Sequence, residues 1–264
     1  MTTTAIINDL KIHHEIQGDG PPIVFVHGLG ATSSVWHAQR MTLSRNYRVI
    51  VYDRSGCGRS QQAQGGYSVD AWADELAGLL DYLSITSAVV VGHSLGSMVA
   101  QRFVGKHPER TKALILAGGE AELDTNAKNI LTERAKLIDA QGLFAVVDSW
   151  LSAVLSPATR EANSALAGLV REMFLANDAK TYAMHCLALR DGSALKDQAN
   201  IVCPTLLLVG DHDLVTPIRW QQQIAAGIVN SRIRIIPYTG HMTMLERPDV
   251  FNTVFMDFLA EIAL

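Results

Sequence analysis

The segment "VVVGHSLGSM", residues 89–98, runs from three valines into a serine that has a glycine two positions away on either side. Consecutive β-branched residues predict a buried strand, and the residues that follow the serine predict a helix. Glycines at 92 and 96 let a strand and a helix meet in a sharp, strained turn without collisions. The pattern G-x-S-x-G in this setting therefore predicts that the Ser94 hydroxyl stands above the carboxyl end of a sheet, where ligands bind in open α/β sheets.

Similar apolar segments recur along the chain, with amphipathic helical segments between them. This alternation predicts an α/β fold with a mostly parallel central sheet and helices on both faces. Residues 3–17 predict an antiparallel hairpin around Asn8 and Asp9, at one edge of the sheet. The further strands are predicted at 22–28, 48–53, 88–92, 112–119, 205–211 and 232–238, and the helices at 70–83, 95–107, 217–228 and 248–262.

The middle of the chain interrupts this rhythm. Residues 120–196 contain no strand-like run and predict four helices, at 124–140, 143–155, 157–175 and 178–190. A helical block between two sheet strands is typical of a lid over a site rather than of a separate unit. We therefore expect a helical cap (120–196) inserted after the sixth strand of a core domain formed by residues 1–119 and 197–264.

Composition limits the classes of function. The 264 residues carry a formal net charge of −4, which favours neither nucleic acid nor an anionic membrane as a partner. No segment reaches the ~18 apolar residues of a membrane helix, and the first residues do not resemble a secretion signal. The three cysteines lack a C-x-x-C spacing, so we expect no disulfide framework, no metal and no cofactor in a cytoplasmic protein. The oligomeric state stays open.

A serine hydroxyl becomes a nucleophile only when a base takes its proton and a carboxylate orients that base. Nine histidines compete for this role, and His241 is favoured because its loop lies between the last predicted strand and the last helix. Asp211 and Asp213 both follow the strand 205–211, and we expect Asp213 to be the acid because it starts the turn toward the His241 loop. Glu120, at the end of another strand, is a third candidate.

Hydrolysis of a carbonyl compound also requires donors for the oxyanion. The loop "VHGLGAT" leaves its strand at Gly28, and its small residues allow backbone N–H groups to point into the site. We expect the two donors to be the N–H of Leu29 and the N–H of Leu95, which begins the helix after Ser94.

Over its whole length the chain resembles the α/β-hydrolase fold family. The motifs that carry this resemblance are HGLG (27–30), YDRSGCGRS (52–60), GHSLG (92–96), GDHDLVTP (210–217) and GHMTMLERP (240–248). Their order places Ser94, Asp213 and His241 in the sequence order of that family's catalytic triad. Within the family, the chain is most similar to the 3-oxoadipate enol-lactonase-like and carboxylesterase branch, through residues 173–193 and Trp150.

The resemblance implies a serine hydrolase that cleaves a small ester or lactone through an acyl-enzyme. One alternative keeps the triad and hydrolyses a carbon–carbon bond in products of ring meta-cleavage. Another is a non-catalytic ligand receptor on a hydrolase scaffold. Trp150 and Tyr182 of the cap are the candidates for contact with the small-molecule substrate.

Overall fold

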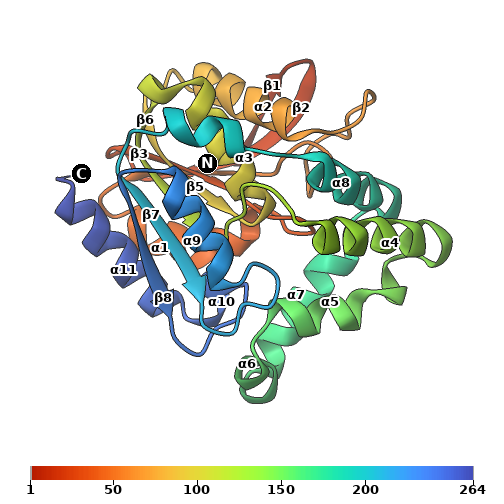
Figure 1. The fold of residues 1–264 in the computed structure, drawn as a ribbon. Coiled ribbons are helices and arrows are strands. Elements are labelled where there is room, and N and C mark those ends of the chain that lie inside the picture. Colours follow the sequence, from red (N-terminus) through yellow and green to blue (C-terminus); the bar gives the residue numbers. More distant parts are fainter. Residues whose placement is uncertain (1, 264) are drawn as a thin grey trace.

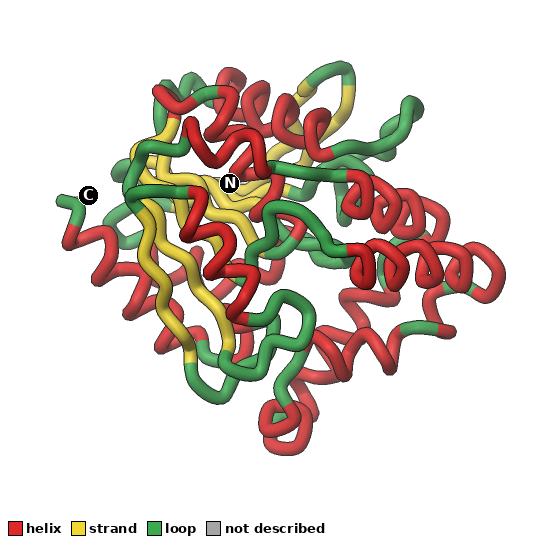
Figure 2. The backbone as a smooth tube through the Cα atoms, viewed as in Figure 1, coloured by secondary structure: helices red, strands yellow, loops and turns green. Residues whose placement is uncertain are grey.

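The computed structural model describes residues 2–263, which form an eight-stranded sheet with helices on both faces (Figures 1 and 2). The strand order is β1-β2-β4-β3-β5-β6-β7-β8. The predicted α/β fold class is therefore confirmed. The strands are β1 Thr2–Ile7, β2 Leu10–Gln17, β3 Pro22–Val26, β4 Arg48–Tyr52, β5 Ala88–His93, β6 Thr111–Ala117, β7 Thr205–Gly210 and β8 Ser231–Ile236.

The first two strands form the predicted antiparallel hairpin at one edge of the sheet. Asn8 and Asp9, between β1 and β2, both have positive φ, 48° and 66°, which suits a tight two-residue turn. Strand β2 also pairs antiparallel with β4, whereas β4, β3, β5, β6, β7 and β8 are parallel neighbours. The carboxyl ends of these parallel strands therefore meet at one side of the sheet, where a site can form.

Burial follows position in the sheet. Every residue of β5 and β7 is buried, as expected for apolar strands that are covered on both faces. Strand β8 pairs only with β7 and exposes part of its length, which agrees with its alternating sequence. Helices α2, α3 and α9 cover one face, and α1 and α11 cover the other (Figure 1).

Two helices outside the insertion, α1 and α10, were not predicted from the sequence. Both are short, and a helix of one or two turns shows little hydrophobic periodicity. Among the described residues, no helix is long and apolar enough to span a membrane. The bounds are α1 His37–Leu43, α2 Val69–Tyr82, α3 Leu95–Lys106, α9 Ile218–Gly227, α10 Thr243–Glu246 and α11 Pro248–Glu261, with 3-10 turns at Ser33–Trp36, Pro108–Arg110, Leu143–Ala145 and Leu195–Asn200.

Five helices lie between β6 and β7 and project together from one side of the sheet (Figure 1). Two of the four predicted helices were wrong in extent. The one expected at 143–155 is divided into a 3-10 turn and α5, and the one expected at 157–175 is broken at Asn163, whose side chain accepts from the N–H of Leu166 and starts α7. These inserted helices are α4 Thr125–Gln141, α5 Val147–Val154, α6 Pro157–Ala162, α7 Ser164–Leu175 and α8 Ala179–Asp191. That these helices form a cap over a site, inserted in the core domain, stays a prediction.

Two ionisable side chains, Arg54 and Glu75, are buried beside the sheet, where a loop after β4 meets α2. The guanidinium of Arg54 lies 4.4 Å from the ring centre of Trp72 and is inaccessible to solvent. The Glu75 carboxyl accepts the Ser55 N–H at 3.1 and 3.2 Å. Burial raises the pKa of Glu75 to about 7, although the Ser55 hydrogen bonds and Arg54 act in the opposite direction.

Glu75 should make the stability of the fold depend on pH. Between pH 4.5 and about 7 an unfolded Glu75 ionises while the folded one keeps its proton, so the free energy of unfolding falls as pH rises through this window. Glu75→Gln retains an acceptor for Ser55 but does not titrate. Relative to wild type, the free energy of unfolding of Glu75→Gln should therefore increase as pH rises from 4.5 to about 7, by up to about 3 kcal/mol. Urea titrations at several pH values measure this difference. A difference that does not change between pH 4.5 and 8 would contradict this.

Candidate active site

Ser94 occupies the turn between β5 and α3 with a backbone conformation that side chains rarely adopt, at φ 52° and ψ −126°. The glycines around it are required by close packing. A Cβ at Gly92 would lie 2.3 Å from the Gly96 carbonyl oxygen, and one at Gly96 would lie 2.3 Å from the carbonyl oxygen of Val26. The Ser94 N–H donates to the carbonyl of Ala117 at 3.0 Å, so the turn is also tied to β6.

His241 and Asp213 form a buried hydrogen-bonded pair. His241 Nδ1 lies 2.9 Å from Asp213 Oδ2, and the Thr216 hydroxyl donates to the same oxygen at 2.9 Å. The other oxygen, Oδ1, accepts the N–H groups of Val215 and Thr216 at 2.9 and 2.8 Å. A carboxylate that accepts from Nδ1–H leaves Nε2 of the imidazole free to accept a proton.

Burial by itself raises the pKa of Asp213, but His241 and the Thr216 donors outweigh it and hold the pKa below the usual range. The structure therefore places an ionised Asp213 against His241. Asp211 lies elsewhere, because its carboxylate contacts His212 Nδ1 at 2.8 Å and accepts the Thr239 N–H at 3.1 Å. Of the two candidates that follow β7, Asp213 is the one in contact with the histidine.

Ser94 and His241 line the same cavity, which has a volume of about 250 Å³. Its wall is mainly apolar, and helices α4 and α5 contribute to it. Among the other sequence candidates, Leu29, Glu120 and Trp150 line this cavity. The remaining lining residues are His93, Leu123, Ala127, Ile130, Leu131, Arg134, Ala153, Val154, Leu189, Leu214, Val215, Thr216, Trp220 and Met242.

Tyr182 does not belong to this wall. Its buried ring packs edge-on against Phe174, 5.0 Å between ring centres, and lies against Gly30 of the first loop. The interpretation of Tyr182 as a substrate contact is therefore not supported by its position. The reason is that α8 places this ring against the loop after β3 and against Phe174 of α7.

A larger hollow of about 520 Å³ lies between α2, α3 and α8. Its lining includes Asp70, Arg102, Asp191 and Lys196 but neither Ser94 nor His241. The smaller cavity is the candidate active site, because Ser94 and His241 both line it.

The expected oxyanion donors lie at two chain turns beside Ser94. Residues 28–31 form a turn closed by the N–H of Ala31 on the Gly28 carbonyl, and the Leu29 N–H is not part of that hydrogen bond. Leu95 is the first residue of α3, so its N–H has no carbonyl partner within the helix. Helix α3 also directs its positive end toward the turn that holds Ser94.

Two buried residues that the sequence did not single out hold these loops in place. Arg54 donates from Nε to the His27 carbonyl at 3.2 Å and from Nη2 to the Gly28 carbonyl at 3.1 Å. His93 Nε2 lies 3.1 Å from the backbone carbonyl of His241 and donates to it. Burial, followed by the proximity of His241, lowers the pKa of His93 to about 3, so its ring is neutral at neutral pH. No sequence signal marks either role, because both partners are backbone atoms distant in sequence.

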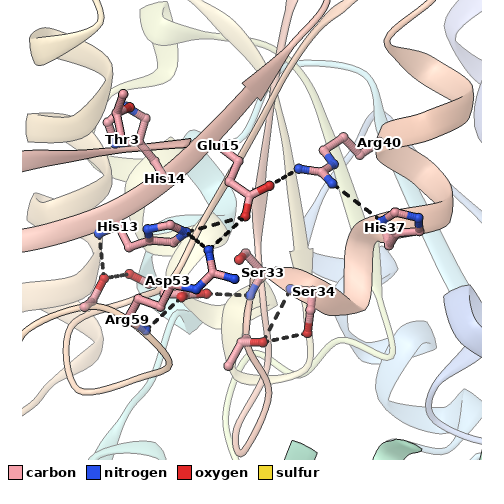
Figure 3. Close-up of polar contacts among 12 residues, drawn as sticks. Thr3, His13, His14, Glu15, Ser33, Ser34, His37, Arg40, Asp53 and Arg59 are labelled. Carbon is pink, nitrogen blue, oxygen red and sulfur yellow. Dashed lines mark hydrogen bonds and ion pairs between the residues drawn. The ribbon is translucent and has the colours of Figure 1, made fainter. Parts of the chain in front are cut away.

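The histidines of the hairpin belong to a different polar cluster, which Figure 3 shows between β2, α1 and the loop after β4. His13 Nε2 lies 3.5 Å from the Glu15 carboxylate, which also pairs with Arg40. Asp53 accepts the N–H of Ser33 at 2.7 Å and that of Arg59 at 3.0 Å. The Asp53 carboxylate thus joins two loops, as a structural element of the motif at residues 52–60.

A model of the alpha/beta hydrolase family matches residues 23–254, and the chain belongs to this family. The fold described above is the alpha/beta hydrolase fold. Curated relatives have about the same length as the chain. A protein of Stutzerimonas stutzeri named "Putative carbamate hydrolase RutD" is 28% identical over 95% of this chain and 96% of its own, and one of the same name from Pantoea ananatis is 29% identical over 94% and 92%.

Solved structures of hydrolases superimpose on nearly the whole chain. The enol-lactonase from Burkholderia xenovorans LB400 has a TM-score of 0.93 at 26% identity and covers 98% of this chain and 100% of its own. A thermophilic esterase from Thermogutta terrifontis, solved with malate bound, has a TM-score of 0.90 at 27% identity and covers 99% of both chains. The resemblance to the enol-lactonase and esterase branch is in agreement with these neighbours.

Proposed function

We propose that the protein is a serine hydrolase of small esters or lactones that works through an acyl-enzyme, with Ser94, His241 and Asp213 as its triad. One observation carries this proposal. The strained turn presents Ser94 to the same cavity as His241, and the imidazole of His241 is oriented by a buried, ionised carboxylate. Such a group of a nucleophile, a base and an orienting acid is the minimum that acyl transfer requires.

In this mechanism Nε2 of His241 accepts the Ser94 proton as Oγ attacks the substrate carbonyl carbon. The negative charge that develops on the carbonyl oxygen is stabilised by the N–H groups of Leu29 and Leu95. The imidazolium then protonates the leaving alcohol, and Asp213 stabilises its positive charge. In the second half, His241 takes a proton from water, whose oxygen attacks the acyl carbon. The imidazolium then returns this proton to Ser94 Oγ as the C–O bond of the acyl-enzyme breaks and the acid is released.

The size and lining of the cavity favour a small and mostly apolar substrate. Its volume of about 250 Å³ lies below the range of about 300–1,000 Å³ that is common for ligand pockets. Helices α4 and α5 would act as part of a cap over Ser94, with Trp150 against the substrate. An enol-lactonase and an esterase among the structural neighbours support this class.

Carbamate hydrolysis is a second candidate, because curated relatives that match along almost the full chain carry that name. In a carbamate, the carbonyl carbon is bonded to a nitrogen where that of an ester is bonded to a carbon. Ser94 would attack this carbonyl carbon in the same way.

A substrate panel tests the proposal. We expect kcat/KM for p-nitrophenyl esters to be highest for short acyl chains and to fall by at least about tenfold toward long chains, because the cavity is small. Small lactones and p-nitrophenyl carbamates complete the panel, together with a vinylogous diketone acid for carbon–carbon cleavage. Activity that rises toward long chains, or cleavage of the diketone acid alone, would overturn the assignment. Binding without turnover of any compound would indicate a receptor.

A further inference from the structure

The cavity wall contains a second carboxyl group that the mechanism above does not use. Glu120 is 1% exposed and lines the same cavity as Ser94 and His241. Neither of its carboxyl oxygens has a hydrogen-bond partner within residues 2–263. A buried polar group without a partner destabilises the folded protein, so its presence beside Ser94 points to a ligand.

The main chain around Glu120 is held so that the side chain faces the cavity. Its N–H donates to the Ser97 hydroxyl at 3.1 Å, and its carbonyl accepts the Gln101 amide at 2.9 Å. Gln221 of α9 donates to the preceding carbonyl, that of Gly119, at 2.7 Å. Side chains from α3 and α9 thus fix both peptide groups, and the Glu120 carboxyl is left as the free end.

The charge state of this carboxyl follows from its surroundings. Burial, followed by the negative charge of Asp213, raises the pKa of Glu120 well above its usual value. With Asp213 ionised, Glu120 is the neutral acid of the two. A neutral carboxyl group has one O–H donor and one C=O acceptor side by side. Its complement is a group with an adjacent acceptor and N–H donor.

We propose that the Glu120 carboxyl is a binding subsite beside Ser94, which holds an uncharged amide-like group of the substrate by one donated and one accepted hydrogen bond. Carboxamides, lactams and carbamates are of this class. The subsite specifies a substrate class for the proposed hydrolase function and rests on that function. Glu120 is then a specificity residue for the substrate's polar part, while the Leu29 and Leu95 amides serve the reacting carbonyl. The half-buried Arg134 is a separate polar group of the cavity, next to the Tyr182 hydroxyl.

The test compares p-nitrophenyl esters whose short acyl chains, of two lengths, end in a methyl, a carboxamide or a carboxylate. We expect wild type to favour the carboxamide over the methyl ester in kcat/KM by about tenfold or more, because only the carboxamide satisfies Glu120. Glu120→Leu should lower that ratio at least tenfold and raise kcat/KM for the methyl ester. Glu120→Gln, which keeps a donor and an acceptor, should retain most of the preference. Glu122→Gln, an exposed neighbour outside the cavity, is the matched control and should keep the wild-type ratio.

Other outcomes separate the subsite from the reaction. An equal loss for all three esters in Glu120→Leu, or no change of the ratio, would overturn the subsite while the hydrolase assignment stands. A carboxylate preference that is lost only in Arg134→Met would move the polar subsite to Arg134. If wild type turns over no ester, the proposed function fails. The subsite is then tested by the dissociation constants of the carboxamide and methyl esters for Ser94→Ala with and without Glu120→Leu, measured by calorimetry. Equal affinities for both esters in Ser94→Ala alone would overturn it.

Discussion

Ser94→Ala is expected to lower kcat for ester hydrolysis by about 10⁶-fold, since the variant has no oxygen that can attack the carbonyl carbon. The strained turn should persist, because the N–H of residue 94 still donates to Ala117 and alanine is smaller than serine. Thermal unfolding should therefore be close to that of the wild type. Some catalysis over water should remain, from binding and the oxyanion donors.

The measurement pairs steady-state hydrolysis of a short p-nitrophenyl ester with mass spectrometry after labelling by a fluorophosphonate. The label should attach to wild type at residue 94 and not to Ser94→Ala. Ser149→Ala, at an exposed position of α5, serves as the control and should retain activity and labelling. A Ser94→Ala protein with substantial turnover, or a wild type labelled at another serine, would show that the nucleophile lies elsewhere.

Asp213→Asn is expected to lower kcat by about 10⁴-fold through the tautomer of His241. The N–H groups of Val215 and Thr216 require an acceptor at Oδ1, so the asparagine carbonyl oxygen should take that place. The amide nitrogen then faces His241 Nδ1 as a donor. His241 must accept at Nδ1 and carry its proton on Nε2, where it cannot take the proton of Ser94.

Asp211→Asn is the matched comparison, with the same chemical change two residues away. Because Asp211 contacts His212 and Thr239 rather than His241, we expect its kcat to stay within about tenfold of wild type. Kinetics of both variants on one short ester check the assignment. A large loss in Asp211→Asn combined with a small one in Asp213→Asn would reverse the roles of the two carboxylates.

Much of the fold could be predicted from local sequence. The buried strands are marked by apolar, β-branched runs such as the one before Ser94, and the hairpin is marked by Asn8 and Asp9, which tolerate positive φ. The glycine at 92 is required by a contact within the turn, whereas the one at 96 is required by the carbonyl oxygens of Val26 and His27 on the neighbouring strand and its loop. Helix ends inside residues 120–196 were less predictable, because a single capping side chain such as Asn163 breaks a helix that periodicity alone would continue.

The site residues also differ in whether local sequence or a distant contact determines their position. The turn at Ser94, the loop at Gly28 and the positions of His241 and Asp213 after their strands are readable from patterns within a few residues. The choice of Asp213 over Asp211 depends on the direction of a turn relative to a loop 28 residues away. The same holds for Arg54 on the carbonyls of the first loop, for Glu120 in the cavity wall and for Tyr182 outside it. These contacts join residues brought together only by strand order and helix packing, and a periodic pattern along the chain carries no information about which distant atoms meet.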